Sequence, residues 1–127
     1  MATATATLTQ YAYPKGRDNT QRRSIIYGTC AIQAAAATYA AGGLAITWSQ
    51  IAERNPTTTP AVAWFYSNAP VSTNDYIYVW NKSTNKLQIY TGAAAQTGLT
   101  ELTDGASIPA GVSGDTIEFR AEFLRYI

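Results

Sequence analysis

The stretch from Asp75 to Thr91 constrains the fold more than any other part of the sequence, because it has the pattern of a β-hairpin. It reads D-Y-I-Y-V-W-N-K-S-T-N-K-L-Q-I-Y-T, with large apolar side chains at alternate positions on both sides of a polar centre. Successive side chains of a strand point to opposite faces, so this alternation predicts two short strands. The polar run from Asn81 to Asn85 predicts the turn between them, since Asn and Ser side chains bond to their own backbone and Asn tolerates a positive φ.

Both faces of this predicted hairpin carry large side chains, which indicates that something packs against each face. The candidates for the second face are another sheet, a partner subunit or a ligand. We expect the aliphatic residues to face the core of the domain, namely Ile77, Val79, Leu87 and Ile89. We then expect the aromatic residues to face a neighbouring subunit or a covering loop of the same chain, namely Tyr76, Tyr78, Trp80 and Tyr90.

Other short runs of β-forming residues are separated by turns rich in Gly, Pro and Asn. The clearest is the last, in which Ile117 and Phe119 begin an apolar face and Glu118 and Arg120 begin a polar one. This pattern predicts a half-buried antiparallel strand whose outer face carries cross-strand pairs of Glu and Arg. The expected strands cover residues 2–8, 24–32, 44–51, 61–66, 76–80, 87–90, 99–102 and 117–124.

The alanine-rich segment Gln33–Ala41 fits a strand, a loop or a helix, since alanine is the best helix former. Its short length and the following Gly42 and Gly43 favour a strand and a tight reversal.

Seven or eight short strands with no clear helix predict an all-β fold, an antiparallel β-sandwich or jelly roll. The 127 residues are too few for two ordinary domains. We expect residues 24–127 to form a single β-sandwich domain, and residues 1–23 to form an N-terminal strand and an extended basic arm. The Ala/Thr alternation of residues 2–8 supplies little apolar area, so we do not expect that strand to be firmly held in an isolated monomer.

Charged residues make up 13% of the chain, against roughly 25% in a typical soluble domain. A surface so poor in charge is weakly protected against association, so we expect neighbouring molecules, including copies of the chain as a dimer or trimer, to cover much of it. The net charge of +1 argues against nucleic acid or anionic lipid as a partner. No apolar run approaches the roughly 20 residues that span a bilayer, and residues 1–5 lack the pattern of a secretory signal.

The sequence argues against catalysis and against a metal or cofactor. It contains no histidine, which removes the commonest general base and zinc ligand. Its single cysteine, Cys30, lies among apolar residues and is expected to be a buried thiol. Glu118 and Glu122 share a strand face about 13 Å apart, too far for a retaining glycosidase pair and awkward for an inverting one. Asp104 and Asp115 each adjoin a glycine and are expected in turns, without the carboxylate spacing of a calcium loop.

Nine tyrosines and three tryptophans leave three interpretations open. Such side chains fill cores and protein interfaces, and they also stack on sugars or nucleobases. We favour core or subunit interface, then sugar binding, because only Lys82 and Lys86 supply positive charge near the hairpin.

A second candidate site is the basic arm, either a solvated loop or a segment that lies against an acidic protein surface. Its cations are Lys15, Arg17, Arg22 and Arg23.

Several segments in order resemble a known class of protein. They are R-R-S-I-I-Y-G-T over residues 22–29, Y-A-A-G-G-L over 39–44, Y-I-Y-V-W-N over 76–81 with N-K-L-Q-I-Y over 85–90, Glu101-Leu102, and G-D-T-I-E-F-R-A over 114–121. Their order is similar to that in small head structural proteins of tailed bacteriophages, of the capsid decoration (cement) type. The Ala/Thr start and the alanine-rich insert at residues 33–37 depart from that pattern.

The resemblance implies a β-sandwich or jelly-roll module on the outside of the virion capsid, assembled in the bacterial host cytoplasm. It implies the major capsid protein as partner and reinforcement of the shell as function, without enzymatic activity. Two alternatives stay open. One is a carbohydrate-binding or receptor-binding module of a phage fibre that uses Tyr76, Tyr78 and Trp80, and the other is a neck or tail-completion protein.

Overall fold

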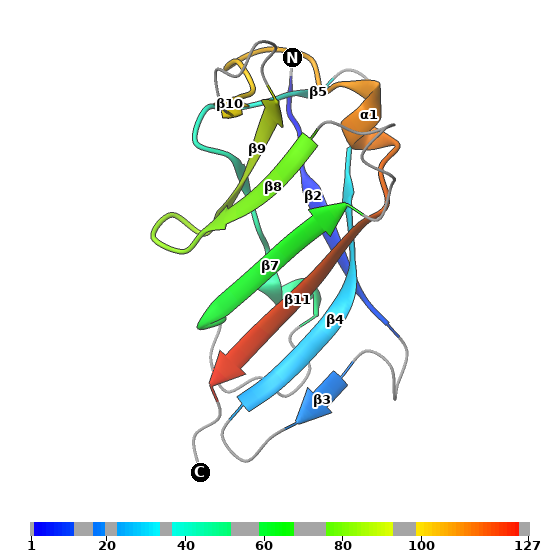
Figure 1. The fold of residues 1–127 in the computed structure, drawn as a ribbon, viewed down its shortest axis with the longest axis vertical. Helices are drawn as coiled ribbons and strands as arrows, with labels where there is room; N and C mark the ends of the chain where they lie inside the picture. Colours follow the sequence, from blue (N-terminus) through cyan, green and yellow to red (C-terminus); the bar gives the residue numbers. More distant parts are fainter. Residues whose placement is uncertain are drawn as a thin grey trace.

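A computed structural model describes residues 2–11, 17–19, 23–33, 37–51, 59–67, 76–92 and 99–124. The predicted all-β fold is confirmed: these residues form two antiparallel sheets, a short parallel pair and almost no helix (Figure 1). The parallel pair joins β1 (Ala2–Thr3) to β5 (Ala37–Thr38). The described residues contain eleven strands, several of two or three residues, so the predicted number of seven or eight is not confirmed.

The larger sheet has five strands in the order β2-β4-β11-β7, with β3 also paired to β4. Figure 1 shows β4, β11 and β7 side by side along the length of the molecule, with β3 beside one end of β4. The alternation predicted for the last strand is confirmed, since Ile117, Phe119, Ala121 and Phe123 are fully buried. The strands are β2 (Ala6–Gln10), β3 (Arg17–Asn19), β4 (Arg23–Ile32), β7 (Val62–Ser67) and β11 (Ile117–Leu124).

The smaller sheet is built on the predicted hairpin, β8 (Tyr76–Asn81) and β9 (Lys86–Gly92). The turn forms as expected: the Ser83 amide donates to Asn81 Oδ1 at 3.0 Å, and Asn85 has a φ of 56°. Two short strands complete the sheet, β6 (Leu44–Ala45) and β10 (Leu99–Glu101). Figure 1 shows β8 next to β7, the edge strand of the larger sheet.

The expected boundary at residue 23 does not separate an arm from the domain. β2 pairs with β4 from Ala6 to Gln10, and Ala4, Ala6 and Leu8 are buried in the core. The backbone of β2 pairs with β4 despite the small side chains of the strand, with Ala6 and Leu8 toward the core and Thr7 and Thr9 on the exposed side. β3 is also part of the sheet, through its pairing with β4.

The segment predicted as one strand over residues 44–51 is a strand for only two residues. It continues as a 3₁₀ helix, η1 (Trp48–Gln50). This turn directs Trp48 into the core and lets Gln50 Oε1 accept a hydrogen bond from the Leu8 amide at 2.7 Å. The single-turn helix α1 (Ala110–Ser113) starts after Pro109 and was also not predicted.

The described part of Gln33–Ala41 supports the strand and turn that the sequence favoured. β5 ends at Thr38, and Gly42 and Gly43 have φ values of 92° and 112°. A Cβ at Gly43 would lie 2.6 Å from the carbonyl oxygen of Leu87, so the reversal needs glycine for space as well as for φ.

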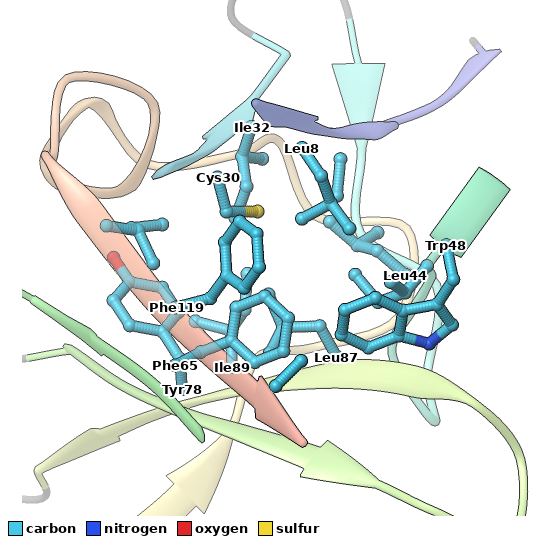
Figure 2. Packing of buried hydrophobic residues seen from close by; sticks show 14 of the residues in the cluster. Leu8, Cys30, Ile32, Leu44, Trp48, Phe65, Tyr78, Leu87, Ile89 and Phe119 are labelled. Atoms are coloured by element: carbon cyan, nitrogen blue, oxygen red, sulfur yellow. The ribbon is translucent and has the colours of Figure 1, made fainter. Parts of the chain in front are cut away.

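Side chains from both sheets form one core around Trp48 (Figure 2). The Trp48 ring lies 6.1 Å from those of Phe65 and Phe119 and 5.8 Å from that of Trp80, measured between centroids. Edge-to-face pairs at such distances add to the stabilisation that comes from burial. Cys30 is buried in the same cluster, which confirms its predicted environment.

The expected orientation of the hairpin is right for Leu87 and Ile89 of β9, which are fully buried, and wrong for β8. Tyr78 is 4% exposed and packs in the core with Leu87 and Ile89, whereas Ile77 and Val79 are 45% and 43% exposed. The register explains this arrangement, because Tyr78 pairs with Ile89 and Trp80 with Leu87, so these residues share a face.

The polar atoms of the aromatic side chains make this burial possible, since each finds a hydrogen-bond partner. The Tyr78 hydroxyl donates to Asp115 at 2.7 Å, and Trp80 Nε1 donates to Asn85 Oδ1 at 3.0 Å.

Candidate functional site

Two sites were predicted from the sequence, the basic arm and the hairpin aromatics, and the structure describes them to different extents. Lys15 and Arg22 lie outside the described residues, while Arg17 begins β3 and Arg23 begins β4. Of the four hairpin aromatics, Tyr76, Tyr78 and Trp80 lie on the core side, with Tyr78 buried and the other two partly buried against the core. Tyr90 lies on the opposite side, where it pairs with the exposed Ile77. The structure therefore does not bring the four predicted aromatics together on one outer surface.

A different cluster lies on the outer face of the five-stranded sheet. The register places two cross-strand rows there. One row is Tyr27, Arg120 and Trp64, from β4, β11 and β7. The other row lies two residues away on each strand and consists of Thr29, Glu118 and Tyr66. We call the five residues Tyr27, Trp64, Tyr66, Glu118 and Arg120 the outer aromatic face.

Two aromatic side chains stand out from this face into solvent. Trp64 is 45% exposed and Tyr66 is 46% exposed, and they occupy alternate positions of β7. Between them lies Phe65, which points the other way and is 5% exposed. Large aromatic rings exposed in this way on a sheet face mark a surface suited to contact with another molecule.

Arg120 fixes the orientation of the indole beside it. Its guanidinium carbon lies 5.1 Å from the centroid of the Trp64 ring, within the range of a cation–π contact. Its Nη2 is 4.0 Å from Glu122 Oε2, on the same strand, while 42% of the Arg120 side chain stays exposed. The residues directly opposite Arg120 on the two neighbouring strands are Tyr27 and Trp64, so Arg120 has no Glu as its cross-strand neighbour.

Glu118 is fixed by a tyrosine from the end of β2. The Tyr11 hydroxyl donates to Glu118 Oε1, and the Tyr11 amide donates to the carbonyl of Tyr27 at 3.0 Å. The hydrogen bond to Glu118 is the main cause that raises the pKa of Tyr11 from 10.0 to about 12. Burial, and then the charge of Glu118, raise the pKa of Tyr66 above its ordinary value. The phenols of Tyr11 and Tyr66 are therefore neutral at neutral pH, and the Tyr11 hydroxyl donates to the Glu118 carboxylate.

The outer aromatic face presents groups that are suited to binding. No group of three or more Cys, Asp or Glu side chains within the described ranges is placed to hold a metal ion. The one thiol, Cys30, is buried, and burial raises its pKa from 9.0 to about 12, so it is protonated and inaccessible at neutral pH. The structure thus offers stacking surfaces and hydrogen-bonding groups.

The outer aromatic face was not predicted from the sequence, although the alternation of two of its strands is visible there. The polar side of Ile117–Leu124 was predicted to be exposed, with Glu118 and Arg120 on it. The alternation of Trp64 and Tyr66 with Phe65 was visible too. The missing information was that β7 and β4 flank β11, because strand order depends on long-range pairing and leaves no local pattern.

Comparison of the chain with protein-family models, with curated proteins and with solved structures finds no match. In the described part of the chain, no helix is long and apolar enough to cross a membrane.

We predict that the protein loses stability at alkaline pH. The pKa values of Cys30 and Tyr11 are raised to about 12, and burial with a hydrogen bond to Glu101 raises that of Tyr39. The unfolded chain releases these protons near the ordinary values of 9.0 and 10.0, whereas the folded protein still holds them. Stability is therefore full below about pH 9 and declines as the pH rises toward 12.

Urea unfolding midpoints between pH 7 and 10.5 test this prediction. Replacing Tyr11 with Phe removes one of the titrating groups and should flatten the decline above pH 10. A midpoint that stays constant across this range would contradict the assignment.

Proposed function

We propose that the chain is a non-enzymatic structural protein of a tailed-bacteriophage virion, a decoration protein that binds the outside of the head and stabilises the shell. The order of sequence segments that resemble such proteins supports this proposal, as does the scarcity of charge. We further propose that the two sheets are the layers of a β-sandwich, because side chains from both line one core. The jelly-roll connectivity stays a prediction.

The observation that carries the proposal is the pairing of β3 with β4. Arg17 pairs with Ile26, and Asn19 pairs with Ser24, so the start of β3 and the start of β4 belong to one hairpin at one end of the sheet. Arg17 and Arg23 therefore belong to one short hairpin, formed by β3 and the start of β4, rather than to an extended arm. We call it the basic hairpin. A basic unit of this kind fits an acidic patch on a major capsid protein, where several weak contacts repeated over many copies would hold the shell.

The aromatic row of the hairpin, which the sequence indicated as the contact between copies, does not form one exposed surface. Tyr78 is buried within its own chain, so it is not available to a second copy. The outward side of the hairpin offers Ile77 and Val79, with Tyr90 paired to Ile77. We propose that these three residues replace the predicted aromatic row as the contact between neighbouring copies in a dimer or trimer.

We predict that changing Arg17, Arg22 and Arg23 together to Ser releases the protein from phage heads. Loss of three cations should weaken attachment by roughly threefold to a hundredfold at moderate salt, since each exposed ion pair contributes about 0.2–1 kcal/mol. The measurement is the amount of protein that sediments with purified heads as salt is raised.

The control changes two other cations to Ser, Lys82 of the hairpin turn and Lys86 at the start of β9, and should leave attachment unchanged. Unchanged occupancy of the triple variant would contradict the role of the basic hairpin. Copy counting by quantitative mass spectrometry tests the wider proposal, because a few copies per virion, or a location in the tail, would favour the neck or tail-completion alternative instead.

A further inference from the structure

We propose that the outer aromatic face, formed by Tyr27, Trp64, Tyr66, Glu118 and Arg120, is a binding site for a neutral saccharide. This inference does not depend on attachment to a capsid, and it places sugar binding on the larger sheet. The aromatic row that the sequence suggested for this purpose faces the core instead.

The stacking surface comes from Trp64 and Tyr66. They alternate on one strand, so their attachment points are about 7 Å apart along β7. A pyranose ring presents a face of C–H bonds that carries partial positive charge, and the faces of indole and phenol rings are negative. Two exposed rings on a sheet can therefore support adjacent sugar units of one oligosaccharide.

The polar groups beside the rings suit hydroxyl groups. Arg120 supplies N–H donors from a side chain that is 42% exposed, and Glu118 supplies carboxylate lone pairs. Tyr66 and Tyr27 contribute hydroxyls on either side of β11. A polyhydroxylated ligand can donate to the carboxylate and accept from the guanidinium at once, so this mixture of donors and acceptors matches its chemistry.

The charges also argue against two other kinds of ligand. Glu122 is buried, so the outer aromatic face carries one carboxylate, Glu118, beside one cation, Arg120. The Glu118 carboxylate disfavours an acidic saccharide placed against it, because like charges repel. Charged groups at the centre of the cluster also differ from the core of a protein interface, where charged residues are depleted.

Contacts within the protein hold the face in one arrangement before a ligand arrives. The guanidinium of Arg120 rests against the Trp64 ring, and the Tyr11 hydroxyl donates to Glu118. Side chains that are already ordered lose less entropy on binding, which favours affinity for a small ligand.

Calorimetric titration of the full chain with lactose, maltotriose, cellotriose and N,N′,N″-triacetylchitotriose tests the proposal. We expect saturable binding of at least one of these neutral sugars, and weaker binding of sialyllactose than of lactose. Trp64→Ala should lower the association constant by about tenfold or more through loss of stacking. Trp64→Phe should restore part of the affinity, and Glu118→Gln should weaken binding less than Trp64→Ala.

The matched control is Leu99→Ala, which removes a side chain that is 54% exposed on β10, in the other sheet. It should bind sugar as the original chain does. Near-ultraviolet circular dichroism and the melting temperature verify that each variant is folded.

Failure to bind any of these sugars at millimolar concentration would overturn the proposal, as would binding that Trp64→Ala leaves intact. Concentration-dependent self-association that Trp64→Ala abolishes, with no sugar effect, would assign the face to contacts between copies instead. None of these results bears on attachment through the basic hairpin, which the arginine variants test separately.

Discussion

Replacing Asn85 with Ala is expected to destabilise the protein by about 3 kcal/mol or more, the largest effect we predict for a polar residue. Asn85 Oδ1 accepts hydrogen bonds from Trp48 Nε1 at 2.7 Å and from Trp80 Nε1 at 3.0 Å. Its Nδ2 donates to the carbonyl of Ile46 at 3.0 Å. One amide therefore joins the hairpin turn to the two indoles and to the segment that leads to η1.

Two separate effects lower the free energy of unfolding of Asn85→Ala. Each partly buried indole N–H that loses its partner costs about 1–3 kcal/mol. Alanine at a φ of 56° adds about 1 kcal/mol, because its Cβ crowds the backbone in the left-handed region. The two Trp rings, which meet edge to face at 5.8 Å, would also lose the group that aligns their nitrogens.

Three companion variants separate these contributions. Asn85→Asp keeps the acceptor for both indoles but turns a carboxylate oxygen toward the Ile46 carbonyl, so it should recover only part of the stability that Asn85→Ala loses. Asn85→Gly loses the hydrogen bonds without the strain, so it should be about 1 kcal/mol more stable than Asn85→Ala. Asn81→Ala removes an exposed contact to Ser83 in the same turn and should cost less than about 1 kcal/mol. Urea unfolding followed by tryptophan fluorescence measures all four, and equal losses at positions 81 and 85 would refute the role of Asn85.

Gly28→Ala should be the most damaging small substitution in the sheet, with a loss of about 3 kcal/mol. A Cβ at this position would lie 2.1 Å from the carbonyl oxygen of Thr9, 2.7 Å from the Phe119 ring and 2.9 Å from Cα of Gln10. Two of these three atoms belong to the backbone of β2, so rotation of a side chain cannot relieve the clash. The variant must move β2 away from β4 or shift Phe119 in the core.

We expect Gly28→Ala to change amide exchange in β2 as well as the overall stability. Amide hydrogens of β2 that bond to β4 should exchange faster, because the strand lies at the edge of the sheet and β4 is the strand that pairs with it. Gly92→Ala is the matched control, since nothing lies within 4 Å of the Cβ it would add and its φ is not positive. It should change stability by less than about 0.5 kcal/mol. Similar losses in the two variants would show that β2 does not pack against Gly28 as described.

The elements that could be predicted were those with a strong local period. The last strand and its buried face, the hairpin with its Asn-containing turn, and the reversal at Gly42 all follow from neighbours in the sequence. Where side chains alternate between apolar and charged, as in Phe119 and Arg120, the pattern also fixes which face is buried. The pattern does not fix the buried face of β8, because Ile77 and Tyr78 are both apolar enough to be buried.

The sequence by itself determined that this chain forms antiparallel sheets, that Cys30 is buried, and that histidine chemistry is absent. Only the tertiary structure decided which face of the opening hairpin is covered, because Asp115, distant in sequence, accepts from the Tyr78 hydroxyl and made burial of the aromatic side favourable together with the bond from Trp80 to Asn85 of the turn. The same holds for the outer aromatic face. Trp64 and Arg120 are far apart in sequence, and they meet because strand pairing places β7 beside β11.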